Sequence, residues 1–211
     1  MSPSEFTALL LLCTAASFTP GPNTTLSTAL AANGGLRRAI VFVLAVPVGW
    51  GLLLGLCAGG VGALVVAVPA LRLGITLIGT AYLLWLAYKL MGVRFQLNPT
   101  GWTSLPAQWR EPDAQLRVGF GQGVLLQFLN IKAWMLALTV VAGWIAGKPD
   151  ALSRFTLVLP TLLLFALASN LSYALLGSLL RDWLSRGARL LRFNRVMAAV
   201  LVLTAGWMAT L

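Results

Sequence analysis

The sequence predicts an all-α, polytopic membrane protein whose six transmembrane helices form two inverted repeats of three helices each. Of its 211 residues, 59% are hydrophobic and only 9% are charged, whereas soluble globular domains carry roughly 25% charged residues. Charged and turn-forming residues divide the chain into six apolar stretches, each near or above the roughly 20 residues that a helix needs to cross a bilayer. Because three crossings reverse the chain, two related halves must have opposite orientations.

The expected spans are delimited by the places where these apolar runs are interrupted. The first follows Met1–Phe6, which contains Glu5 but no basic residue, so we expect it to remain in the mature protein rather than to be cleaved as a signal peptide. A polar stretch at about 92–117 divides the chain into halves of about 1–91 and 118–211, which together form one transmembrane domain. In chain order, the spans are expected at about 5–32, 39–67, 70–91, 118–146, 153–179 and 195–211.

The basic residues predict the orientation of these spans. Eleven of the 15 lysines and arginines fall in the first, third and fifth loops, and the second and fourth loops hold three, namely Arg72, Lys148 and Arg154. Basic residues concentrate in cytoplasmic loops, so both termini are expected outside the cytoplasm. The last cluster, Arg181–Arg195, is expected to contact anionic membrane lipid. The eleven residues are Arg37, Arg38, Lys89, Arg94, Arg110, Arg117, Arg181, Arg186, Arg189, Arg192 and Arg195.

The first span is interrupted by Pro20-Gly21-Pro22-Asn23. Two prolines remove two backbone donors, and their rings obstruct the carbonyl groups one turn earlier, so the helix must break or kink. Beyond the break, Asn23, Thr24 and Thr25 would begin a half-helix whose free N–H groups and positive dipole end suit a carboxylate. The alternative is a structural kink whose freed groups are satisfied by neighbouring helices.

The second half has corresponding features. Its first span is interrupted by Asn130-Ile131-Lys132, and the next span carries Pro160, as the second span of the first half carries Pro47. These two matches, in the same order, favour an internal repeat.

Four segments of the sequence can be compared with known families, namely Phe18-Thr19-Pro20-Gly21-Pro22-Asn23, Gly34, Arg37-Arg38-Ala39 and Gly79–Leu86. Together they resemble the LysE/RhtB family of bacterial amino-acid exporters, and the resemblance runs from the first helix to the last. The resemblance implies efflux of a small amino acid or derivative across the bacterial inner membrane, driven by the membrane potential or the proton gradient. The run Leu126–Lys132 looks closest to the branch that exports cysteine and O-acetylserine; threonine and homoserine are the other substrates considered. Asn130-Ile131-Lys132 stands where the family usually has Asn-Pro-Lys.

Lys132 is the one charged residue expected well inside a span. Such a charge costs about 2.5 to 3.5 kcal/mol on insertion scales, so Lys132 is expected to face a wet cavity or a polar partner rather than lipid. One hypothesis is that Lys132 alternates between holding a proton and pairing with the substrate carboxylate, which would couple protons to efflux. The other is a fixed structural cation bonded to backbone carbonyl groups.

The remaining chemistry excludes several classes of protein. The chain has no histidine, and Cys13 and Cys57 lie in apolar runs without redox spacing. We therefore expect no enzyme activity, no cofactor, no metal site and no nucleic-acid partner. A metal-ion or thiol-redox carrier and a passive channel are the alternative functions. A homodimer remains open.

Two sets of residues are expected to mediate contacts between helices. The first set consists of the glycines Gly51, Gly55 and Gly59. The second consists of polar residues, for which substrate binding is the alternative, namely Gln122, Gln127, Asn170, Ser172 and Tyr173.

Overall fold

The computed structural model describes residues 1–92, 116–186 and 188–210, and within these ranges every regular element is helical. The polar stretch expected at about 92–117 lies almost wholly outside the described residues. The helices are α1 (Pro3–Phe18), α2 (Pro22–Gly34), α3 (Leu36–Ala58), α4 (Val61–Ala67), α5 (Pro69–Gly92), α6 (Phe120–Leu129), α7 (Ile131–Val140), which continues as a π-helical turn (Val141–Ile145), α8 (Ala151–Leu184) and α9 (Arg189–Ala209).

Four of these helices are long and apolar enough to cross a membrane, namely α3, α5, α8 and α9. The pair formed by α6 and by α7 with its π-helical turn is bent by 71° and makes a fifth candidate if it is taken as one span. α1 is a shorter apolar helix of 16 residues. The predicted all-α fold is thus confirmed, and the helices are those of a multi-pass membrane protein.

Two predicted boundaries were wrong. The second span was expected to run to residue 67, but α3 ends at Ala58 because Gly60 adopts a left-handed conformation (φ 93°), and a separate short helix, α4, follows. Left-handed backbone is accessible to glycine without a steric penalty. The last helix begins at Arg189 rather than near residue 195. Its basic first turns are helical because long arginine side chains can extend to water from a helix end.

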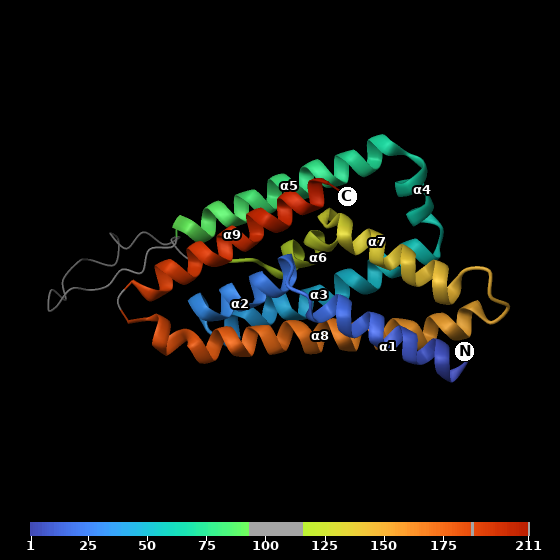
Figure 1. Ribbon diagram of the computed structural model, residues 1–211, viewed down its shortest axis with the longest axis horizontal. Coiled ribbons are helices and arrows are strands. Elements are labelled where there is room, and N and C mark those ends of the chain that lie inside the picture. Colours follow the sequence, from blue (N-terminus) through green and yellow to red (C-terminus); the bar gives the residue numbers. More distant parts are fainter. Residues whose placement is uncertain (93–115, 187, 211) are drawn as a thin grey trace, which may run out of the picture.

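The helices lie mostly along the long axis of the molecule (Figure 1). α2 packs on α8, α3 packs on both α6 and α8, and α5 packs on α9. The turn between α2 and α3 lies at one end of the axis, as does the turn between α8 and α9, whereas α4 and the connection before α8 lie at the other (Figure 1). Large apolar side chains on the outer faces are exposed, including Leu73 and Leu77 of α5 and Leu164 of α8. This pattern fits a lipid-facing exterior.

Close helix approach occurs at glycines other than those predicted. A Cβ atom at Gly51 would meet methyl groups of Leu159 and Leu163 in α8 at ordinary van der Waals distance, and one at Gly55 would meet nothing within 4 Å. Of the predicted set, Gly51 thus lies against α8, whereas Gly55 faces open space. The tight contacts lie elsewhere: a Cβ at Gly79 of α5 would overlap the carbonyl oxygen of Leu129 at the end of α6, and one at Gly177 of α8 would overlap the Thr28 carbonyl of α2.

Gly79→Ala is expected to destabilise the protein. The added methyl group would collide with the Leu129 backbone, so α5 must move away from α6, at a cost of about 3 kcal/mol. The matched control is Gly74→Ala in the same helix, where a Cβ would have no neighbour within 4 Å. Thermal unfolding in detergent should show a lowered midpoint for Gly79→Ala only; equal midpoints for the two variants would contradict the close approach.

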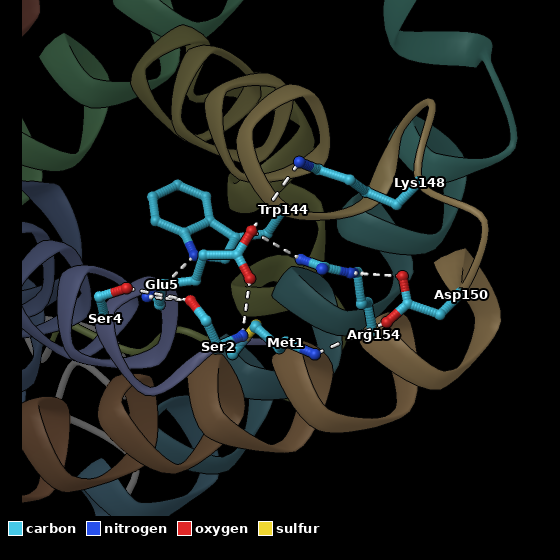
Figure 2. A network of polar contacts seen from close by, with 8 residues as sticks. All are labelled: Met1, Ser2, Ser4, Glu5, Trp144, Lys148, Asp150 and Arg154. Atoms are coloured by element: carbon cyan, nitrogen blue, oxygen red, sulfur yellow. Dashed lines mark hydrogen bonds and ion pairs between the residues drawn. The ribbon is translucent and has the colours of Figure 1, made fainter.

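A network of polar contacts fixes the start of α1 to the segment before α8 (Figure 2). The Arg154 guanidinium lies 3.1 Å from the Glu5 carboxylate and 2.7 Å from that of Asp150. Lys148 adds a longer contact to Glu5, at 3.8 Å, and the amino group of Met1 lies 3.6 Å from Asp150. The contacts join residues about 150 positions apart in sequence and hold the first and fifth predicted spans together at this end.

The stability of this end is expected to fall in acid. The hydrogen bond from Arg154 lowers the pKa of Asp150 below its ordinary value of 3.8. A carboxyl group whose pKa is lowered by folding stabilises the fold above its unfolded pKa, and this contribution is lost as the pH falls through the folded pKa. The unfolding midpoint should therefore decline below about pH 4. The decline should be smaller in Arg154→Gln; an equal decline would show that this contact contributes nothing.

Candidate functional site

Both predicted interruptions are breaks between separate helices. α1 ends at Phe18 and α2 begins at Pro22, because Pro20 and Pro22 have no N–H to donate to the carbonyl groups four residues earlier. In the second half, Asn130 has extended backbone (φ −97°, ψ 97°) between α6 and α7. The second helix is thus broken although the family's usual proline is replaced by Ile131.

Side chains from other positions satisfy several carbonyl groups that the breaks leave free. The Tyr173 hydroxyl of α8 donates to the Phe18 carbonyl at 3.0 Å, and Ser169 donates to that of Ser17 at 2.5 Å. Within the second break, the Trp134 indole N–H donates to the Phe128 carbonyl at 2.9 Å. For Tyr173, the predicted interhelical role is therefore confirmed.

The helix that follows the first break, α2, begins with free backbone N–H groups. The Thr25 N–H bonds the Gly21 carbonyl at 3.0 Å, but among the described residues no acceptor is found for the N–H groups of Asn23 and Thr24. Thr24 caps the turn through its hydroxyl, which contacts the Gly21 N–H at 3.0 Å. Two free N–H groups at a helix N-terminus, together with the helix dipole, form an environment suited to an anion.

A pair of amide side chains joins the two breaks. Asn23 donates to the Gln127 side-chain oxygen at 2.8 Å, and Gln127 donates back to the Asn23 oxygen at 3.1 Å. Gln127 is fully buried, and a Cβ on Gly49 of α3 would come within 2.5 Å of its Cγ. The pair therefore has little room to move, and it fixes α2 to α6 next to both breaks.

The two breaks line one cavity of about 60 Å³. Its polar residues come from the breaks and from α8, and its apolar wall is formed by side chains of α3, α7 and α8. A volume of this size accommodates a few water molecules. The lining residues are Ala16, Ser17, Thr19, Gly21, Pro22, Asn23, Thr24, Trp50, Asn130, Lys132, Ala133, Leu136, Leu162, Ala166 and Asn170.

Lys132 extends from the start of α7 toward the first break. Its Nζ lies 3.9 Å from the position that a Cβ on Gly21 would occupy, and 5.6 Å from the centre of the Trp207 ring. Over the described part of the chain, it makes no hydrogen bond or ion pair with the protein. It is the only charged residue among those that line the cavity.

Most of the residues predicted from sequence meet at this cavity. Gly21, Pro22, Asn23, Thr24, Asn130 and Lys132 all line it, whereas Pro20 is exposed and Thr25 is buried elsewhere. Sequence reasoning missed the lining residues Ala16, Trp50 and Leu162, because nothing marks them in an apolar run. Asn170 was noted as polar; it lines the cavity and also accepts a hydrogen bond from Ser27 at 2.9 Å.

Apolar helices long enough to cross a membrane, with two breaks that meet at a polar cavity, are the features of a multi-pass membrane transporter. The comparisons with known proteins agree: residues 14–210 match the model of the LysE type translocator family, and the chain belongs to this family. It is 29% identical over 208 residues to a cysteine/O-acetylserine efflux protein of Salmonella paratyphi A, and 28% identical over 205 residues to that of Escherichia coli K12. Each alignment covers 97% of both chains. No solved structure matches the chain.

Proposed function

We propose that this protein exports a small amino acid or derivative, with cysteine and O-acetylserine as the first candidates, across the bacterial inner membrane. The observation that carries the proposal is the meeting of two helix breaks at one cavity that holds free N–H groups and a lysine. The names of the relatives supply the substrate class.

The substrate carboxylate would bind between the start of α2 and the start of α7. The free N–H groups of Asn23 and Thr24 supply fixed donors at the first of these helix ends, and Lys132 supplies a full positive charge from the second. Discontinuous helices whose N-termini face an anionic group are a recurring arrangement in secondary transporters.

The broken helices also support six spans arranged as two inverted repeats. In this arrangement α1 and α2 form the first span and correspond to α6 and α7, while α3 corresponds to α8 and α5 to α9. Both α3 and α8 contain an internal proline, Pro47 and Pro160. Corresponding helices also lie against each other, α3 on α8 and α5 on α9, as they would if each pair flanked a two-fold axis.

Proton coupling is proposed to depend on Lys132. Desolvation penalises the charged form of an amine, and in the part of the chain that the structure describes no carboxylate lines the cavity to offset that penalty. Lys132 would be protonated while it pairs with the substrate carboxylate, and desolvation would favour release of that proton once the carboxylate has left. Proton movement and efflux would then share one site.

Transport by the purified protein in proteoliposomes tests the proposed function. Vesicles loaded with unlabelled cysteine or O-acetylserine should take up the labelled compound by counterflow, and an imposed proton gradient should increase flux. Uptake of a divalent metal ion without amino-acid counterflow would favour the metal carrier. Flux of unrelated small solutes that does not saturate would favour the passive channel.

The proposed orientation gives a separate prediction. Reporter fusions at Leu211 and Trp102 should report the carboxyl terminus outside the cytoplasm and the central stretch inside, because eleven basic residues then lie in the cytoplasm against three outside. A cytoplasmic carboxyl terminus would contradict the six-span arrangement.

A further inference from the structure

The cavity contains an unsatisfied acceptor besides its donors. Asn130 is only 5% exposed, and its side-chain oxygen has no hydrogen-bond partner among the residues that the structure describes. Buried carbonyl oxygens are nearly always paired, and an unpaired one needs a specific explanation. Because Asn130 lines the cavity, a bound ligand with donor groups supplies that explanation.

A second acceptor lies at the end of α1. The N–H that would bond the Ala16 carbonyl in a continuous helix belongs to residue 20, which is a proline and has none. Ser169 and Tyr173 bond the next two carbonyl groups along α1. No donor within the described ranges reaches the Ala16 carbonyl group, which lies at the negative end of the α1 dipole. Ala16 is also one of the residues that line the cavity.

From these two oxygens we infer that the side chain of Asn130 and the carbonyl group of Ala16 accept hydrogen bonds from the α-ammonium group of the substrate. An ammonium group has three donors and no acceptor, and no carboxylate of the described residues lines this cavity to pair with it. Neutral oxygens at a helix C-terminus can meet that cation. This inference rests on the proposed function, in which the N–H groups of α2 and Lys132 hold the carboxylate.

With donors that bind the carboxylate and acceptors that bind the ammonium group, the site requires a substrate with a free, charged amino group. A site that hydrogen-bonds a polar group leaves its own acceptors unpaired when the ligand lacks that group, and it then discriminates strongly. The substrate class is therefore α-amino acids whose amino and carboxylate groups are both free, and compounds that keep the carboxylate but lack the amino group should be rejected.

Competition with counterflow of labelled cysteine under reducing conditions tests the inference. The competitors are cysteine, 3-mercaptopropionate, which lacks the amino group, and cysteamine, which lacks the carboxylate. For the wild-type protein, 3-mercaptopropionate should compete at least about 100-fold more weakly than cysteine. The gap is the ratio by which cysteine competes more strongly than 3-mercaptopropionate. In Asn130→Leu this gap should shrink below about 10-fold, because cysteine binds more weakly, while the preference for cysteine over cysteamine remains.

Two variants control for structural damage. Thr80→Val removes another buried oxygen that has no partner but does not line the cavity, so its gap should stay at the wild-type value. Asn130→Asp keeps an acceptor and should retain the gap. A wild-type gap of less than about threefold, or a full gap in Asn130→Leu, would overturn the inference and leave the proposed function standing; absence of any amino-acid counterflow by the wild type would overturn both.

Discussion

Lys132→Ala is expected to abolish proton-driven export, with a loss of at least about 100-fold in flux. Among the described residues, the substitution removes the only charge that lines the cavity, and with it the proposed partner of the substrate carboxylate. A charge-assisted hydrogen bond lost from a buried site accounts for an effect of this size. Flux of labelled cysteine in proteoliposomes, with and without an imposed proton gradient, measures it.

Lys132→Arg separates the two hypotheses for this residue. Arginine keeps the positive charge but does not release its proton in proteins, so carboxylate binding and counterflow should persist while dependence on the proton gradient disappears. An arginine variant whose export still follows the gradient would show that Lys132 is not the coupling group and would favour the fixed structural cation. Lys89→Ala is the matched control, since Lys89 lies 4.3 Å from the centre of the Trp85 ring and does not line the cavity.

Replacing Pro20 and Pro22 together with alanine is expected to reduce export below about one-tenth while the protein stays folded. The two new N–H groups would bond the Ala16 and Phe18 carbonyl groups, so α1 and α2 would join into one helix. An internal proline costs a helix about 3 kcal/mol, so the unfolding midpoint in detergent should stay the same or rise. Loss of transport without loss of stability is the distinguishing result.

The control for this variant is Pro69→Ala at the start of α5. A proline in the first turn of a helix replaces an N–H that has no intrahelical partner, so this change should affect neither transport nor stability. Near-normal efflux from the Pro20 and Pro22 double variant would return the segment to the role of a structural kink. The same outcome would remove the main support for a carboxylate site at α2.

The sequence by itself determined the features that depend on local chemistry. Low charge and long apolar runs identified a helical membrane protein because burial of apolar surface in lipid depends on composition. The first break was predictable because a proline cannot donate a backbone hydrogen bond wherever it lies in a helix. Lys132 was singled out because a charge in an apolar run is costly. The family resemblance was likewise confirmed by the match to residues 14–210.

Only the tertiary structure decided which of these features meet. The bent connection at Asn130, the pairing of Asn23 with Gln127 and the contacts of Glu5 with Arg154 join residues that no local pattern relates. The glycines show the same limit: Gly55 belongs to a regularly spaced set in α3 but faces open space, whereas Gly79 is in contact with another helix end. Whether a residue is crowded, paired or left unsatisfied depends on which atoms of distant segments reach it, and that is fixed by packing rather than by neighbours in sequence.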